Sequence, residues 1–261
     1  MICERLVLQM LRQVIERLSR GVVLRRRLPP QFGGSRLFVS PESGLKYYRS
    51  DLNSADPVLF RMAQELVKPA DVVWDIGANV GLFAFAAAAI SGPQGQVIAV
   101  EPDIWLADLL HRSSRLPAPE RAPVIVIPLA VSDRIELTQL HIAVRGRSAN
   151  FIEGGGSSRT GGTRNTESVI SVTLDWLLGL LPAPQVLKID VERVEGRLLS
   201  GASRMLTEVR PRIWCEVSTE CEPMVTGILR AASYEIYDAS VNHSARKPLR
   251  RAVWETLAVP K

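Results

Sequence analysis

The most constraining feature of the sequence is a glycine-rich turn between an apolar strand and an alanine-rich helix. Val72–Trp74 is a short apolar run that predicts a buried strand. Asp75-Ile76-Gly77-Ala78-Asn79-Val80-Gly81 follows it, and the stretch from Gly81 to Ile90 is rich in alanine, which favours a helix. Glycines let the backbone turn tightly and approach a ligand with no side chain in the way. A strand, turn and helix of this kind predict a ligand site at the turn.

Strands and helices alternate along the rest of the chain. Apolar runs predict further strands at Val97–Val100, Val124–Pro128, Val186–Ile189 and Ile213–Val217. Helices are predicted at Ile104–Arg115 and Glu195–Leu206. This alternation predicts an α/β fold with a mostly parallel sheet covered by helices on both faces.

One section interrupts this rhythm. Ile135–Val144 and Val169–Val172 predict an inserted pair of strands. Between them, Gly146–Asn165 is rich in Gly, Ser and Thr, and a loop of this length fits either a lid over a binding site or a disordered segment.

The N-terminal part of the chain predicts two smaller units. Residues 1–30 are interpreted as a basic helical extension, because apolar residues repeat at helical spacing over residues 4–19. Residues 31–68 are interpreted as a hairpin, with strands at Leu37–Val39 and Leu45–Tyr48, followed by a helix from Pro57 to about Val67. Residues 69–261 then form the main domain.

The positive charge of the chain belongs to the N-terminal extension. The net charge is +5, and residues 1–27 hold seven arginines and two glutamates, a surplus of five. The remaining residues carry equal numbers of acidic and basic side chains, which argues against a nucleic-acid partner. The amphipathic helix fits packing on the main domain or on a second subunit, as in a homo-oligomer, or peripheral contact with an anionic membrane surface.

Other sequence features point to a cytoplasmic protein. Cys3, Cys215 and Cys221 are odd in number and scattered, which predicts free thiols rather than a disulfide framework or a zinc site. No apolar stretch approaches 18 residues, and Arg5 and Arg12 interrupt the N-terminal apolar pattern, so neither a membrane span nor a signal peptide is expected.

The turn and the next strand together favour one cofactor. Glu101 ends the strand after the turn, where a carboxylate can accept both hydroxyl protons of a ribose. The turn reads G-x-N-x-G, shorter than the G-x-G-x-x-G of dinucleotide sites. S-adenosylmethionine is therefore favoured over a dinucleotide, while a turn that binds nothing is the third interpretation. The expected cofactor-binding residues are Asp75, Gly77, Ala78, Asn79, Gly81, Glu101 and Pro102.

Six segments in a common order resemble the FkbM family of S-adenosylmethionine-dependent methyltransferases. They are Asp75–Gly81, Val97–Pro102, Pro128–Asp133, Val172–Leu177, Leu187–Glu195 and Pro211–Val217. The resemblance implies a Rossmann-like methyltransferase fold with a seven-stranded sheet and an antiparallel strand near the C-terminus. Its last two strands would be Tyr234–Tyr237 and Thr256–Val259. The resemblance also places Ser132 and Asp133 near the adenine.

The chain departs from the family at Arg193. The family usually has glycine at this position. Arginine would disturb the site if the glycine takes a positive φ or allows close approach of substrate. Alternatively, Arg193 makes a substrate contact of its own.

Three carboxylates are the candidates for the chemistry. Asp190, Glu192 and Glu216 fall at the carboxyl ends of predicted strands, where open α/β sheets bind ligands. They could bind substrate, act as the base that an oxygen acceptor needs, or hold a divalent cation, although no metal site is indicated. In the alternative interpretations, these residues have no role in a site: Glu192 pairs with Arg193 or Lys188, Glu216 caps a loop, and Lys188 faces a solvated edge.

These expectations together describe an enzyme. The hypothesis is O-methylation of a hydroxyl on a glycan or a small-molecule natural product. The competing hypothesis is a catalytically degenerate methyltransferase fold that acts as a scaffold or binding protein.

Overall fold

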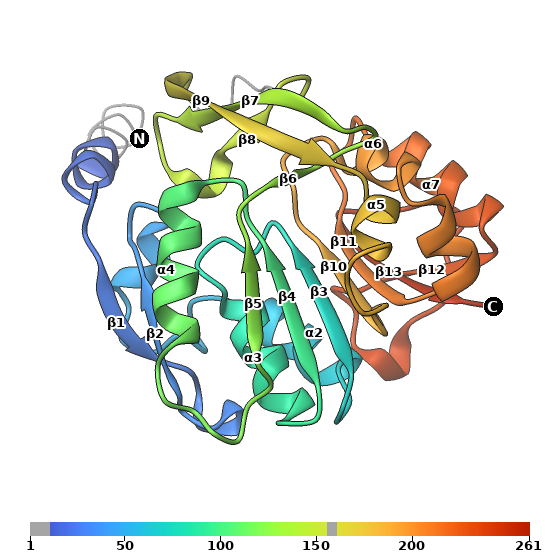
Figure 1. The fold of residues 1–261 in the computed structure, drawn as a ribbon, viewed down its shortest axis with the longest axis horizontal. Coiled ribbons are helices and arrows are strands. Elements are labelled where there is room, and N and C mark those ends of the chain that lie inside the picture. Colours follow the sequence, from blue (N-terminus) through green and yellow to red (C-terminus); the bar gives the residue numbers. More distant parts are fainter. Residues whose placement is uncertain (1–10, 156–160) are drawn as a thin grey trace.

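A seven-stranded sheet forms the centre of the molecule (Figure 1). The structure is a computed structural model that describes residues 11–155 and 161–261. The strand order is β12-β13-β11-β10-β3-β4-β5. The strands are β3 (Val72–Ile76), β4 (Gln96–Val100), β5 (Val124–Ile127), β10 (Val186–Ile189), β11 (Arg212–Glu216), β12 (Tyr234–Asp238) and β13 (Glu255–Pro260). Strand β13 runs antiparallel to both of its neighbours, and the other neighbouring pairs are parallel. The predicted Rossmann-like methyltransferase fold is confirmed.

Helices cover both faces of this sheet because alternate strand residues point to opposite sides. Val73 and Val97 pack in one core with α2 (Pro57–Leu66), α3 (Leu82–Ser91) and α4 (Ile104–Ser114). Trp74 and Ile98 pack in a second core with α5 (Leu174–Leu178), α6 (Glu195–Ser200) and α7 (Glu222–Ala231). Among the described residues, no helix is long and apolar enough to cross a bilayer.

The helix predicted at Glu195–Leu206 is shorter than expected. Helix α6 ends at Ser200, and Met205–Val209 form a separate π-helical turn. At Gly201 a Cβ atom would lie only 2.7 Å from the carbonyl oxygen of Ser132, so the chain needs glycine there. This close approach ends the helix where the periodicity alone continues it.

The N-terminal hairpin pairs differently from the prediction. Strand β2 (Arg36–Val39) pairs antiparallel with β1 (Leu24–Arg27). The strand predicted at Leu45–Tyr48 is wrong, because these residues form a 3₁₀ helix, η2. Leu45, Lys46 and Tyr47 all line one pocket, whereas neighbouring residues of a strand would point to opposite faces. Residues 31–68 share a continuous apolar core with the main sheet.

The inserted strands form a second, four-stranded sheet. Its order is β6-β9-β7-β8, from β6 (Ala130–Val131), β7 (Glu136–Ala143), β8 (Phe151–Ile152) and β9 (Thr163–Val172). This sheet lies beyond the arrowheads of β3, β4 and β5 in Figure 1. Most of the predicted Gly146–Asn165 loop is therefore ordered, with residues 156–160 outside the described part.

A buried carboxylate connects the insertion to the N-terminal segment. Glu42 accepts hydrogen bonds from the backbone N–H of Gly21, from Arg147 Nε at 2.8 Å and from Arg164. Burial alone would raise the pKa of Glu42, but these three donors outweigh it and hold the pKa below its ordinary value. The charged form of Glu42 therefore stabilises the contact between three distant segments.

Replacing Glu42 by glutamine is expected to lower the free energy of unfolding by about 2 kcal/mol at pH 7, because the partly buried Arg164 loses its counter-charge and Arg147 keeps only Asp103. The folded-state pKa lies below the unfolded value, so the ionised group stabilises the fold above the unfolded pKa. That contribution is lost as the pH falls through the folded pKa. Urea unfolding at pH 7 and in mild acid measures both effects.

The exposed Glu120→Gln variant is the matched control for this measurement. An equal loss for Glu42→Gln at both pH values would contradict the assignment.

Candidate active site

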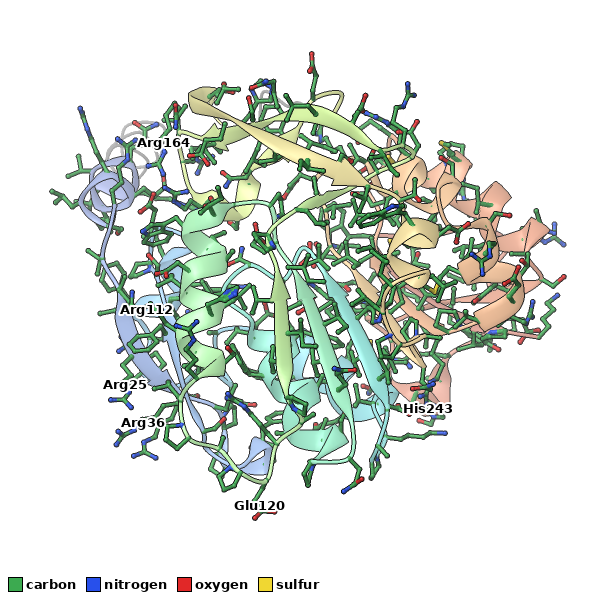
Figure 2. All side chains as sticks on the ribbon, viewed as in Figure 1. Arg25, Arg36, Arg112, Glu120, Arg164 and His243 are labelled. Carbon is green, nitrogen blue, oxygen red and sulfur yellow. The ribbon has the colours of Figure 1, made fainter. Side chains whose placement is uncertain are left out.

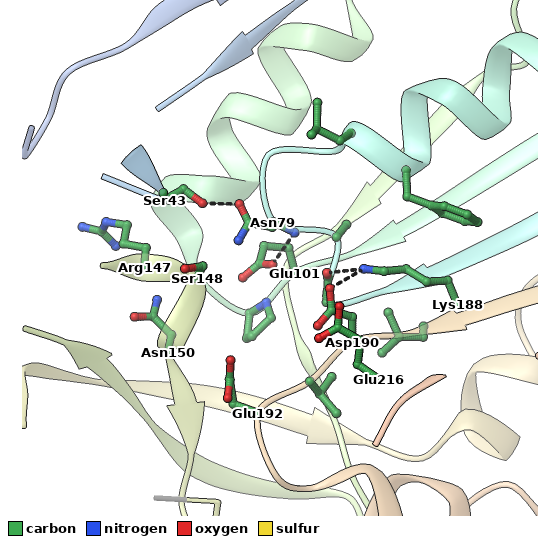
Figure 3. Close-up of a pocket in the computed structure, with 18 of the residues that line it drawn as sticks. Ser43, Asn79, Glu101, Arg147, Ser148, Asn150, Lys188, Asp190, Glu192 and Glu216 are labelled. Carbon is green, nitrogen blue, oxygen red and sulfur yellow. Dashed lines mark hydrogen bonds and ion pairs between the residues drawn. The ribbon is translucent and has the colours of Figure 1, made fainter. Parts of the chain in front are cut away.

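A pocket of about 490 Å³ opens at the carboxyl ends of β3, β4, β10 and β11. The second sheet and η2 supply its other walls. Figure 3 shows polar side chains at the ends of these strands and in the connection between β7 and β8 around it. Eight predicted site residues line the pocket: Gly77, Ala78, Asn79, Glu101, Pro102, Asp190, Glu192 and Glu216. The other four, Asp75, Gly81, Ser132 and Asp133, lie nearby but do not line it.

The turn after β3 takes a conformation that suits glycine. Gly77 has φ 77°, and a Cβ atom there would lie 1.9 Å from the carbonyl oxygen of Asp190. Gly81 has φ 88° and caps α3, where it packs against Leu110 and Phe85. Gly77 thus lets the turn lie against the end of β10, while Gly81 serves the packing of the helix.

Glu101 holds this turn from the end of β4. Its carboxylate accepts hydrogen bonds from the backbone N–H groups of Asn79 at 2.7 Å and Asp103 at 3.0 Å. Burial raises the pKa of Glu101 to about 8, although these two N–H groups favour its charged form. A buried carboxylate with lone pairs facing the pocket suits the hydroxyl groups of a ribose.

Lys188 on β10 is buried at the floor of the pocket, which it lines. Its Nζ atom lies 3.0 Å from Asp75 Oδ1 and 3.1 Å from Asp190 Oδ2, and it donates a hydrogen bond to the carbonyl oxygen of Gly77. Burial alone would lower the pKa of Lys188, but Asp190 and Asp75 hold it well above its ordinary value. The solvated-edge interpretation of Lys188 is therefore wrong. Asp75 is fully buried beside Lys188 rather than exposed in the pocket.

The candidate carboxylates differ in how they are compensated. Asp190 has Lys188 as its counter-ion, and Figure 3 shows this pair. Burial and the charges of Asp190 and Glu195 raise the pKa of Glu192 to about 7. Burial and the charges of Asp190 and Glu255 raise the pKa of Glu216 to about 8. Glu192 and Glu216 have no ion-pair partner among the described residues.

Several residues that line or adjoin the pocket could not be identified as site residues from the sequence. Ser43 donates a hydrogen bond to the Asn79 side chain, and Lys46 pairs with Asp56 at 2.5 Å. Arg147 lies 2.5 Å from Asp103. These side chains come from segments far from the turn in sequence, and only the folded chain brings them to the pocket.

Ser132 and Asp133 follow β6 at the side of the pocket. Ser132 is buried and donates to Asp133, whose carboxylate also pairs with Arg134 and Arg197 at 2.8 Å each. Arg134 and Arg197 hold the pKa of Asp133 well below its usual range, against the effect of burial. The preceding residues Ala130 and Val131 line the pocket. The contact of Ser132 and Asp133 with an adenine stays a prediction.

No group of three or more His, Cys, Asp or Glu side chains in residues 11–155 and 161–261 is arranged to hold a metal ion. The acidic side chains of the pocket are instead spread over several walls.

Residues 75–236 match the sequence model of the methyltransferase FkbM domain, which covers more than half of the chain. The chain belongs to the FkbM methyltransferase family. It is 32% identical over 165 residues to a hexuronic acid methyltransferase, AglP, from Haloferax volcanii. This match covers 61% of the chain and 61% of the relative, so the chain spans less than two thirds of that protein's length.

Two solved structures are similar to this chain at lower sequence identity. The methyltransferase FkbM from Methylobacillus flagellatus KT has 15% identity and a TM-score of 0.44, over 88% of this chain and 57% of that one. A precorrin-6Y C5,15-methyltransferase from Geobacter metallireducens has 12% identity and a TM-score of 0.43, over 79% and 87%. The fold assignment rests on the strand order and on the family match.

At the position of the family glycine, Arg193 has φ 62°. The backbone there takes the left-handed conformation, which costs a non-glycine residue about 1 kcal/mol or more. The Arg193 side chain pairs with Glu220 at 3.4 Å and does not line the pocket. Of the two interpretations, the positive φ is confirmed and a direct substrate contact has no support.

Replacing Gly77 by alanine is expected to abolish cofactor binding and lower the melting temperature, because the new Cβ atom would clash with the backbone of Asp190. Gly44→Ala is the matched control, since Gly44 also lines the pocket and its nearest neighbour to a Cβ atom lies at 3.6 Å. Calorimetric titration and thermal unfolding of both variants compare the two effects. Full binding by Gly77→Ala would contradict the close approach of the turn.

Proposed function

We propose that this chain binds S-adenosylmethionine and transfers its methyl group to a hydroxyl group of a glycan. The observation that carries the proposal is that the Gly77–Asn79 turn and Glu101 line the same pocket as the carboxylates Asp190, Glu192 and Glu216. A donor site and an acceptor site in one pocket are what direct transfer between two bound molecules requires.

The residues present fit this cofactor. Glu101 would accept the ribose hydroxyl groups, and the glycine-lined turn leaves room for the ligand to lie against the backbone. The acidic side chains around the pocket repel one another as carboxylates, so a ligand with a positive charge, such as the sulfonium of this cofactor, would favour their ionised forms. Bound S-adenosylmethionine supplies a methyl group that is already activated for in-line displacement.

Glu192 is the best candidate for the base that removes the proton from the acceptor hydroxyl. A general base works best when its pKa lies near the working pH, and the pKa of Glu192 is raised to about 7. Its carboxylate points into the pocket and has no ion-pair partner among the described residues (Figure 3). Asp190 is already paired with Lys188, so it is better suited to binding than to proton transfer.

The choice of a glycan rests on the relative and on the pocket chemistry. The Haloferax volcanii relative is named as a hexuronic acid methyltransferase. Carboxylate, amide and hydroxyl side chains such as Glu216, Asn150 and Ser148 line the pocket and match the hydroxyl groups of a sugar. A small-molecule natural product offers similar hydroxyl groups. A degenerate scaffold has less support, because the turn and Glu101 keep the features that a cofactor needs.

Replacing Glu101 by glutamine is expected to weaken S-adenosylmethionine binding about 10-fold or more, because the amide nitrogen replaces an oxygen acceptor of the ribose hydroxyl groups and an unpaired buried polar group costs roughly 1–3 kcal/mol. Calorimetric titration measures the affinity. Asp108→Asn, an exposed change on α4, is the control. A folded wild-type protein that does not bind S-adenosylmethionine would overturn the proposed function.

Methyl transfer is expected to increase as the pH rises through about 7, because Glu192 must lose its proton before it can accept one. Glu192→Gln is expected to reduce kcat roughly 100-fold or more and to remove this ionisation from the pH profile. Transfer of radiolabelled methyl groups to a hexuronic acid oligosaccharide is the assay. Glu153→Gln, an exposed change outside the pocket, should keep the wild-type profile. If Glu192→Gln kept the wild-type pH profile, the base would be a different residue.

A further inference from the structure

The N-terminal helix docks on the molecule through polar side chains. Residues 11–18 are helical, and the helix packs beside the second sheet (Figure 1). The Glu16 side chain is 9% exposed and lies 3.7 Å from Arg145 Nε. Ser19, just after the helix, is fully buried with its hydroxyl 3.1 Å from that of Tyr48. These contacts use the polar side of an amphipathic helix, which would ordinarily face solvent.

The apolar side of the same helix faces outward. Leu11, Val14, Ile15 and Leu18 are 54%, 52%, 37% and 73% exposed, and we call them the apolar stripe. Their spacing of three and four residues places them along one line of the helix. Four large apolar side chains exposed together indicate an interaction surface rather than the scattered apolar residues of an ordinary surface.

Arginines are frequent in the N-terminal helix and in the segment that follows it. Residues 11–27 contain six arginines and one glutamate. Within the described part of the chain, no carboxylate pairs with Arg17, Arg20, Arg25, Arg27 or Arg36. Figure 2 shows Arg25, Arg36 and Arg112 along the edge of the molecule where β1 lies. The helix that carries the stripe and the adjoining edge of the molecule along β1 therefore present several arginines that lack a carboxylate partner among the described residues.

We propose that the apolar stripe inserts into the surface of an anionic lipid bilayer. The interface of such a bilayer accepts apolar side chains at the level of the acyl chains and holds arginines at its phosphate groups. A second copy of this chain is a poorer partner, because a symmetric dimer would bring the same arginines on both subunits together.

The position of the helix relates this surface to the pocket. Arg12, one residue after the start of the apolar stripe, lines the pocket. Its Nε atom lies 2.9 Å from Glu16, the residue that docks the helix. A bilayer that holds the stripe would therefore lie beside the Arg12 wall of the pocket.

Vesicle flotation of the full chain tests this proposal without methyl donor or acceptor, so its outcome does not depend on the proposed function. The protein is expected to float with phosphatidylcholine vesicles that contain about 30% phosphatidylglycerol, and not with phosphatidylcholine alone. Raising the salt from about 0.1 M to 0.5 M should release most of the bound protein, because salt screens the arginines.

Two variants separate the apolar and the charged contributions. Val14→Ser combined with Leu18→Ser is expected to weaken binding to the anionic vesicles about 10-fold or more, since two apolar side chains no longer insert. Arg17→Glu combined with Arg27→Glu should weaken it to a similar degree and reduce the effect of salt. Circular dichroism checks that both variants keep the wild-type fold.

The matched control changes Leu137 and Ile170 to serine. These residues are 70% and 59% exposed and face each other on β7 and β9, away from the apolar stripe, and their loss should leave flotation unchanged. The proposal would be overturned if the Val14→Ser, Leu18→Ser variant floated as well as the wild-type protein, or if the wild-type protein floated with neither kind of vesicle. Light scattering that shows a stripe-dependent dimer without vesicle binding would assign the surface to a second copy instead.

Discussion

One buried ammonium group organises the carboxyl edge of the sheet. Lys188 is 2% exposed and is compensated by Asp75 on β3 and by Asp190 at the end of its own strand. It also donates a hydrogen bond to the carbonyl oxygen of Gly77, so one side chain connects the turn to the neighbouring strands β3 and β10. A buried charge that loses a partner costs roughly 3–5 kcal/mol. The turn at Gly77 and the Asp190 side of the pocket are therefore held in one arrangement by a single electrostatic unit.

This unit divides the acidic residues of the pocket into two groups. Asp75 and Asp190 are balanced by Lys188. Glu192 and Glu216 form no ion pair among the described residues, and burial together with the repulsion of Asp190 outweighs the attraction of Arg193 and Lys188, so their pKa values rise toward neutrality. Asp190, which takes part in the buried ion pair, thus also contributes to the raised pKa values of Glu192 and Glu216. The same buried charges therefore affect both the structure of the pocket and the pKa values of its carboxyl groups.

The sequence predicts the features of this protein that depend on local patterns. Period and composition were sufficient for five strands of the main sheet, for the helix after Asp56 and for the turn at Gly77, because each needs only a few consecutive residues. Strands β12 and β13 were expected only from the family resemblance. The burial of Lys188 could not be predicted in this way, since its ion pair with Asp75 joins residues more than 100 positions apart. The pairing of β1 with β2 was missed for another reason. The arginines of Leu24–Arg27 obscure the strand pattern, and the partner strand is identified only by its register.

The location of strand β13 has consequences for how the molecule is assembled. It comes last among the seven strands in sequence, yet it occupies an interior position between β11 and β12. Until residues Glu255–Pro260 are in place, both neighbours present unpaired edges, and such edges can join to other chains. The parallel part of the sheet can form beforehand, because β5, β4, β3, β10 and β11 are contiguous. Completion of the sheet thus requires β13 to enter between two strands that precede it in sequence, a non-local step of the kind that slows folding.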